Sequence, residues 1–63
     1  MVVDEVLAQF ADEALRYGKI ISDDEFKLGN VFKHSYCVEY LNRRYYLTKT
    51  NGEWTYFHEG GLL

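Results

Sequence analysis

The sequence lacks most of the devices that stabilise or equip very small proteins other than a packed core. Its 63 residues include a single cysteine, Cys37, so neither an intramolecular disulfide nor a zinc site of four cysteines can form. It has no long apolar run, and the segment Met1–Glu5 carries acidic residues, which argues against a secretory signal and a membrane span. No glycine-rich phosphate loop is present, since no helix is expected after Gly60 and Gly61. We therefore expect a cytoplasmic protein with a reduced thiol.

Aromatic residues are abundant, at 17% of the sequence. A chain of this length forms one small domain, here residues 1–63, and buries only about 60% of the surface that its unfolded chain exposes. Large rings bury much area per residue, so we expect them to take the place of cross-links. Their number exceeds what so small a core can enclose. The last residues, 60–63, are expected to form a flexible tail.

The net charge of −3 is unevenly distributed along the chain. Residues 1–25 contain seven acidic and two basic side chains, whereas residues 26–63 contain three acidic and five basic ones, so the two parts carry −5 and +2. Such an asymmetry concerns surfaces and partners and not the fold. One side of the molecule is expected to be acidic and another mildly basic.

The first element is predicted to be an amphipathic helix over residues 3–17. Apolar side chains recur at spacings of three and four residues along one side, and acidic and other polar side chains occupy the other side. Gly18 follows as a C-terminal cap. We expect the apolar stripe to cover one face of a sheet. Its members are Val3, Val6, Leu7, Phe10, Ala14 and Tyr17.

A second, shorter helical element is predicted over residues 23–28. Ser22 and Glu25 have the spacing of a capping box, and acidic residues fill the first turn, where the helix dipole favours them. Gly29 then ends the segment after Phe26, Lys27 and Leu28. Because so few residues are available, the alternative is a capped loop without a helical turn.

From Val31 onward the apolar period changes to two, which predicts a three-stranded antiparallel meander packed on the helix and hence an α+β fold. Asn51 and Gly52 tolerate the positive φ angles of a type I′ turn, which is the strongest short-range signal for a hairpin. The strands are predicted at 31–41, 44–50 and 53–59. The turn pairs Lys49 with Trp54, Leu47 with Tyr56 and Tyr45 with His58.

The first hairpin of this meander is predicted to turn at Asn42 and Arg43, which pairs Tyr40 with Tyr45. Arginine is a poor residue for positive φ, so a longer loop with a shifted register is the alternative, and a shift by one residue would turn the first strand over. The two turns together assign six apolar side chains to the face under the helix. These are Tyr36, Val38, Tyr45, Leu47, Trp54 and Tyr56.

The second face of the sheet has no helix to cover it. In the predicted register Tyr46 and Phe57 lie opposite each other there, and a central aromatic pair with a polar rim is typical of a protein-binding surface. The alternative is a cross-strand pair that only stabilises the sheet. This predicted partner-binding face consists of Glu39, Arg44, Tyr46, Thr48, Thr55 and Phe57.

No catalytic or metal site is expected. His34 and His58 are predicted on one face but roughly 20 Å apart at ~3.4 Å per residue, and Cys37 is predicted on the opposite face from both. The paired acids are typical of helix caps and solvated helix faces. We therefore expect neither an enzyme nor a cofactor.

The first functional hypothesis is a small non-enzymatic protein-binding module. Its contact surface is either the sheet face or an acidic helix face, which could occupy the basic groove of a nucleic-acid-handling protein. Small acidic inhibitors of phage and mobile elements offer an analogy of size and charge. The acidic face consists of Asp4, Glu5, Asp12, Glu13, Asp23 and Asp24, and its alternative role is that of a solvated helix surface.

Two other hypotheses use the same sheet. Basic and aromatic groups on one β surface can bind single-stranded nucleic acid, although a pI near 5.2 disfavours the approach of phosphates, so this hypothesis ranks second. The groups concerned are Lys33, Arg43, Arg44, Tyr46 and Phe57. The third hypothesis is a homodimer, formed through the sheet face or through an exposed edge strand.

Overall fold

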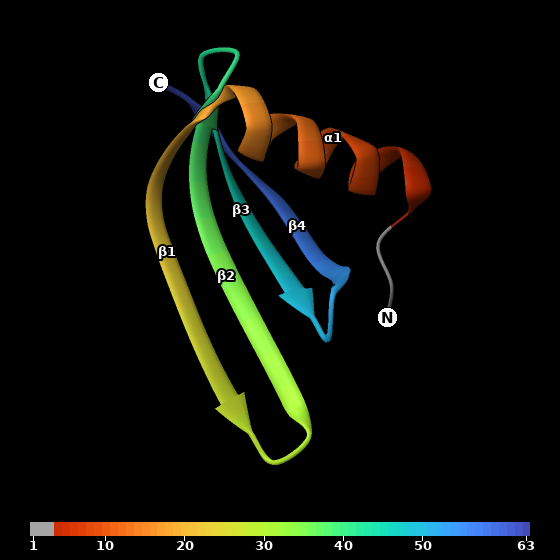
Figure 1. Ribbon diagram of the computed structural model, residues 1–63. Helices are drawn as coiled ribbons and strands as arrows, with labels where there is room; N and C mark the ends of the chain where they lie inside the picture. The colour runs from red at the N-terminus through yellow and green to blue at the C-terminus, as the bar shows by residue number, and fades with distance from the viewer. Residues whose placement is uncertain (1–3) are drawn as a thin grey trace.

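The computed structural model describes residues 4–63 and consists of one helix packed on a four-stranded antiparallel sheet (Figure 1). The strands are hydrogen-bonded in their order along the chain, so the sheet is a meander. The predicted α+β class is confirmed, but the sheet has four strands where the sequence predicts three. The elements are α1 (Glu5–Tyr17), β1 (Lys19–Leu28), β2 (Val31–Tyr40), β3 (Arg43–Thr50) and β4 (Glu53–Leu62).

Helix α1 begins at a cap that the sequence contains. Asp4 accepts a hydrogen bond from the backbone N–H of Val6 at 2.8 Å, which satisfies one of the free donors of the first turn. Gly18 caps the other end and donates its N–H to the carbonyl of Ala14 at 2.8 Å. The predicted start at Val3 lies outside the described residues.

The buried side of α1 differs from the predicted stripe. Ala11 and Ala14 are the fully buried residues of the helix, and their small side chains let the helix approach the sheet closely. Phe10 packs between three rings of the sheet. Val6 and Tyr17, which the sequence assigns to the apolar stripe, remain 72% and 69% exposed.

The predicted helical turn at 23–28 is wrong, because these residues belong to β1. Only three residues separate the capping-box glutamate from Gly29, which is too few to repay the cost of starting a helix. Strand β1 pairs with β2 from Lys19, opposite Glu39, to the closing pair at the Gly29 turn, and its ladder is interrupted only by an irregularity at Ile21. Gly29 adopts a φ of 61°, the conformation that a tight hairpin turn requires.

The turn between β2 and β3 lies one residue earlier than predicted. Leu41 and Asn42 adopt φ angles of 51° and 64°, so they and not Asn42–Arg43 form the two-residue turn. Val38 therefore pairs with Tyr45, and the register moves by two residues relative to the prediction. A shift by two keeps every side chain on its predicted face, which is why the core residues of β2 and β3 are predicted correctly.

The predicted turn at Asn51 and Gly52 is confirmed, with φ angles of 50° and 85°. The Asn51 side chain also accepts a hydrogen bond from the N–H of Phe32 at 2.8 Å, which ties this turn to β2. The pair Lys49–Trp54 next to the turn is as predicted.

Beyond that pair, a β-bulge at Thr55 changes the register of β4. Thr48 pairs with Tyr56 and Leu47 with Phe57, so residues 56–59 lie on the face opposite to their predicted one, up to a second register shift at Gly60. Tyr56 moves out of the predicted core, and Phe57 moves into it. The predicted pair of Tyr46 with Phe57 is therefore wrong.

The core lies between α1 and the sheet. The Phe10 ring lies 5.7 Å from that of Tyr40, 5.1 Å from that of Tyr45 and 6.0 Å from that of Phe57, with the tilted and edge-on geometries that aromatic pairs prefer. The buried residues are Ala11, Ala14, Val38, Tyr45, Leu47 and Trp54.

The C-terminal residues continue the sheet. Residues 60–63 are predicted to form a flexible tail, whereas β4 extends to Leu62, which pairs with Arg43. Leu63 donates its N–H to the carbonyl of Asn42 at 3.0 Å. At the opposite end the β1–β2 hairpin projects beyond the β3–β4 turn (Figure 1).

Candidate interaction face on the sheet

The sheet surface opposite α1, here called the outer face, is not covered by any element within residues 4–63. Cross-strand partners in an antiparallel sheet point to the same side, so the register assigns the side chains of this face. The assignment is anchored by Cys37 opposite Tyr46, because their neighbours Val38 and Tyr45 are both buried under the helix.

The centre of the outer face carries a hydroxyl ladder, which consists of Ser35, Thr48, Thr50 and Thr55. The Oγ atoms of Ser35 and Thr48 lie 3.2 Å apart, and those of Thr50 and Thr55 lie 2.8 Å apart. Thr55, the bulge residue, also donates to the carbonyl of Thr48 at 3.4 Å. These bonds join β2, β3 and β4 through side chains as well as through the backbone.

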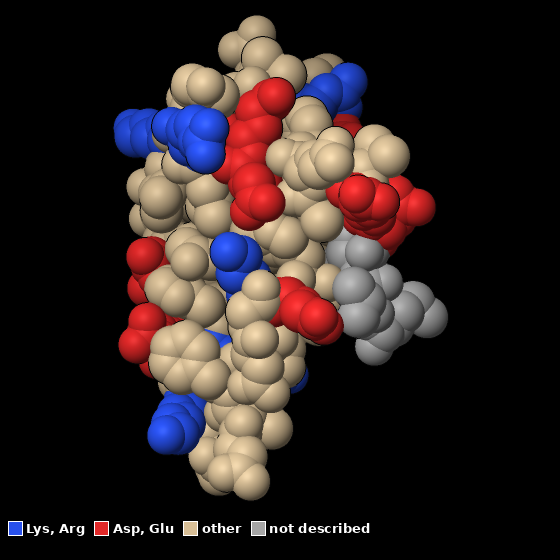
Figure 2. All heavy atoms as spheres, turned by 45° about the vertical axis from the view of Figure 1, so that its right-hand side comes forward, with Lys and Arg blue, Asp and Glu red and all other residues tan. Residues whose placement is uncertain are grey.

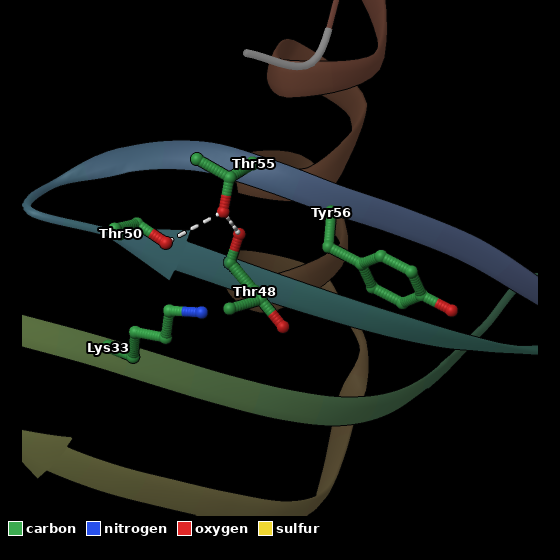
Figure 3. A pocket seen from close by; sticks show the side chains of 5 residues that line it. All are labelled: Lys33, Thr48, Thr50, Thr55 and Tyr56. Atoms are coloured by element: carbon green, nitrogen blue, oxygen red, sulfur yellow. Dashed lines mark hydrogen bonds between the residues drawn. The ribbon is translucent and has the colours of Figure 1, made fainter. Parts of the chain in front are cut away.

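A hollow of about 580 Å³ lies over this ladder (Figure 3). Three threonines from β3 and β4 form its floor, Lys33 of β2 extends along one side, and the Tyr56 ring lies at the other, with α1 behind the sheet. A second hollow, of about 300 Å³, adjoins it on the β1 side and shares Thr48 with it. The outer face is thus uneven, with room for the side chains of another molecule.

An aromatic row crosses β3 and β4 on the same face and consists of Tyr46, His58 and Tyr56. The ring of His58 lies 6.1 Å from that of Tyr46 and 6.4 Å from that of Tyr56. Tyr46 lies over Gly60, where an added Cβ would be only 2.7 Å from its Cε2 atom. Tyr46 and Tyr56 remain 39% and 50% exposed, so they offer apolar area at the surface.

A second apolar group, here called the tip patch, lies at the projecting end of the β1–β2 hairpin. It consists of Phe26, Leu28 and Val31, which are all exposed. Leu28 pairs with Val31, and Phe26 pairs with Lys33, so the patch continues the outer face beyond the hydroxyl ladder. Apolar groups therefore lie at both ends of a polar centre.

The charged side chains of the outer face include one internal ion pair. Arg44 donates to a carboxylate oxygen of Glu39 at 2.8 Å. Hydrogen bonding to Glu39, and secondly to Tyr46, raises the pKa of Arg44. This pair is neutralised within the chain, whereas Lys33 and Asp24 have no ion-pair partner among the described residues.

Five of the six residues predicted for the partner-binding face lie on the outer face, namely Glu39, Arg44, Tyr46, Thr48 and Thr55. Phe57 does not, because the bulge turns it toward Phe10. Tyr56 and His58 were missed for the same reason. The signal that could have revealed them is the spacing of Trp54 and Phe57, two large apolar residues three positions apart, which a strictly alternating strand would place on opposite faces.

The predicted acidic face is divided among other contacts. Asp4 caps the helix, Asp12 accepts from the Trp54 Nε1–H at 3.0 Å, and Glu13 accepts from the Tyr40 hydroxyl at 2.7 Å. Asp23 contacts His34 on the helix side of the sheet. Glu5 is exposed on the helix, and Asp24 lies on the outer face. Acidic and basic side chains alternate over the side of the molecule that α1 occupies (Figure 2).

The two histidines lie on opposite faces, contrary to the prediction. On the helix side of the sheet, the His34 ring stacks on the Tyr36 ring with 4.2 Å between the ring centroids, and it contacts the carboxylates of Asp23 and Glu25. His58 lies on the outer face. Burial, with these two carboxylates adding to it, raises the pKa of Tyr36.

Cys37 and His58 share the outer face, also contrary to the prediction. Tyr46 separates them, at about 4.8 Å per strand, so they do not form a nucleophile and base pair. No group of three or more His, Cys, Asp or Glu side chains within residues 4–63 is arranged to hold a metal ion.

Arg43 and Arg44 also separate, because neighbouring residues of a strand point to opposite faces. Arg43 forms an ion pair with Glu59 at the helix side, so only Arg44 contributes to the outer face.

No protein-family model, no curated protein and no solved structure matches this chain, so no function can be transferred from a relative. Within residues 4–63, no helix has both the length and the apolar character that crossing a membrane requires.

Proposed function

We propose that this chain is a non-enzymatic protein-binding module and that the outer face is its contact surface. The observation that carries the proposal is an uncovered sheet face on which the half-exposed tyrosines of the aromatic row lie beside a polar, hollowed centre. Buried aromatic anchors in a polar rim are the usual source of affinity in protein interfaces, and the aromatic row supplies such anchors.

The acidic helix face is the weaker candidate for the contact surface. Four of its six carboxylates bind partners within the chain, as caps or as links between α1 and the sheet. A surface that imitates nucleic acid requires a continuous field of negative charge. The Nζ atom of Lys49 lies 3.9 Å from an Asp12 carboxylate oxygen, so its positive charge weakens that field. The inhibitor hypothesis of the sequence is therefore retained only in its general form, as binding to another protein.

The test compares a wild-type bait with two variants in capture from a nuclease-treated lysate, with mass spectrometry as the readout. The double variant Tyr46→Glu/Tyr56→Glu places two charges on the aromatic row. The matched control is Tyr17→Glu, which makes the same chemical change on α1, at a side chain that is 69% exposed. Circular dichroism of each bait establishes that it is folded.

A protein retained by the wild type and by Tyr17→Glu, but lost from the double variant, supports the outer face as the contact surface. A protein retained equally by all three baits assigns binding to another surface and contradicts the proposal. Phe57, although a member of the predicted partner-binding face, is unsuitable for this test, because it packs against Phe10 and Tyr45 and Phe57→Glu would damage the core.

Binding of single-stranded nucleic acid is the second candidate, and the aromatic row is the observation that favours it. Exposed rings can stack with bases, and Lys33, which lines the same hollow as Tyr56, offers a positive charge to a phosphate. The Glu39–Arg44 pair and the overall charge of −3 oppose it. Fluorescence anisotropy with a labelled oligothymidylate tests this candidate. If the chain binds single-stranded nucleic acid, its affinity for the oligonucleotide should fall steeply with added salt and be lost in Lys33→Glu.

A further inference from the structure

The described core is thin for a chain of this size. Two of its six buried residues are alanines, while five large apolar or aromatic side chains are exposed on the outer face alone. A single core in so small a domain rarely supplies more than about 3–5 kcal/mol of stability. Covering the outer face would bury a second set of apolar side chains and relieve this deficit. The exposed members are Phe26, Leu28, Val31, Tyr46 and Tyr56.

The outer face carries unpaired charges of both signs. Asp24 of β1 pairs in register with Ser35, and Lys33 of β2 pairs with Phe26, so the two charged residues lie on neighbouring strands two register steps apart. They form no ion pair with each other. Lys33 borders the larger hollow, and Asp24 borders the smaller one. A surface with this layout is complementary to itself.

The size of the molecule permits a contact of standard size only if most of the outer face takes part. Its two longer dimensions, 36 and 23 Å, set an upper limit of roughly 800 Å² on the flat area of this face, and each partner contributes about 800 Å² to a standard interface. Two antiparallel sheets that pack face to face, with side chains interdigitating between them, form a common two-layer architecture.

We propose that a second copy of this chain occupies the outer face, so that two sheets pack against each other with both helices outside. A two-fold axis in the plane between the sheets, crossing the line from Asp24 to Lys33 at its midpoint and at a right angle, places each carboxylate against the ammonium group of the other copy. The contact is isologous and therefore contains this ion pair twice. The inference rests on the proposed function, because it names the partner for the same face.

Charge reversal at these two positions gives a test that a single chain cannot imitate. In Asp24→Lys, both contacts of the dimer bring two cations together, and in Lys33→Asp both bring two anions together. Each variant alone is expected to dimerise about 10-fold or more weakly than the wild type. When the two variants are mixed, both contacts become attractive again, so a heterodimer forms. The double variant Asp24→Lys/Lys33→Asp restores the homodimer.

Sedimentation velocity over a hundredfold range of concentration measures these equilibria, and circular dichroism shows that each variant is folded. Cys37 provides a second readout, because the chain's only thiol is half-buried on the outer face and should react faster with a thiol reagent as the dimer dissociates on dilution.

A wild-type chain that remains monomeric overturns the inference, as do single variants that dimerise like the wild type or a mixture that fails to associate. A monomeric wild type leaves the proposed function open to its own test, since the outer face is then free for a different protein. If the wild type is monomeric and captures a protein that Tyr46→Glu/Tyr56→Glu does not capture, that protein is the occupant of the outer face.

Discussion

Substitution of Gly18 tests how closely the end of α1 approaches the sheet. A Cβ atom at this position would lie 2.5 Å from the carbonyl oxygen of Ala14 and 2.8 Å from that of Glu39. Both contacts are with backbone atoms, so no flexible side chain can move aside. The backbone itself accepts alanine, since its φ of −84° and ψ of −178° are those of extended chain. The cost is therefore steric.

The expected magnitude for Gly18→Ala follows from two opposing effects. Overpacking of this kind costs about 1–3 kcal/mol, and the reduced freedom of the unfolded chain returns about 0.4–1 kcal/mol. A net loss of about 1–2 kcal/mol corresponds to a fall in Tm of roughly 5–15 °C for a domain of this size. Thermal unfolding followed by circular dichroism measures it.

Gly29 provides the matched control, because it has a φ of 61° and no atom within 4 Å of an added Cβ. Alanine is strained there by backbone conformation alone, and asparagine, which tolerates that conformation, should recover much of the loss. Asparagine at Gly18 should be no better than alanine. A Gly18→Ala protein as stable as the wild type, or recovery by Gly18→Asn, would refute the steric account.

Three further predictions concern the core, the helix–sheet link and the outer face. Leu47→Ala should cost about 2–5 kcal/mol, because the side chain is only 1% exposed, and circular dichroism should show a largely unfolded chain. The hydrogen bond to Glu13 raises the pKa of Tyr40 above its ordinary value of 10.0. This hydrogen bond therefore stabilises the folded protein below pH 10.0, and its contribution is lost as the pH rises through the raised pKa. The free energy of unfolding of Tyr40→Phe, measured by urea unfolding, should change less over that pH range than that of the wild type. Gly60→Ala should displace the Tyr46 ring and weaken binding at the outer face while lowering Tm little, since the clash is with the far end of a side chain; an unchanged Tyr46 ring environment in NMR spectra would contradict this.

The parts of the fold that the sequence predicts correctly are those decided by local signals. The helix is marked by its apolar period, and the Asn51–Gly52 turn is marked by two residues that accept positive φ. Gly18 was correctly expected to end the helix, but the structure gives a different reason. Its φ is negative, so the glycine is required by close packing against Glu39 and not by a left-handed cap.

Strand β1 was missed because its local and non-local signals conflict. Ser22 and Glu25 resemble the start of a helix, but a capping box stabilises only a helix that follows it. The strand conformation is stabilised instead by backbone pairing with β2, which a local sequence signal does not reveal. Gly29 and Asn30, between the apolar residues Leu28 and Val31, form the two-residue turn that indicates a hairpin here.

The candidate site depends on one residue that strand periodicity alone does not specify. Without the bulge at Thr55, Phe57 would lie in solvent and Tyr56 under the helix, which would expose the more apolar ring and bury a phenol hydroxyl. With the bulge, Trp54 and Phe57 both enter the core, and Thr55 hydrogen-bonds within the hydroxyl ladder. The same insertion thus completes the core and brings Tyr56 and His58 beside Tyr46 on the outer face. Deletion of Thr55 leaves Trp54 opposite Lys49 and Tyr56 opposite Thr48 in an unbroken ladder, so the side chains keep their faces. That variant should therefore retain its fold and its outer-face binding, whereas Tyr46→Glu/Tyr56→Glu should lose binding.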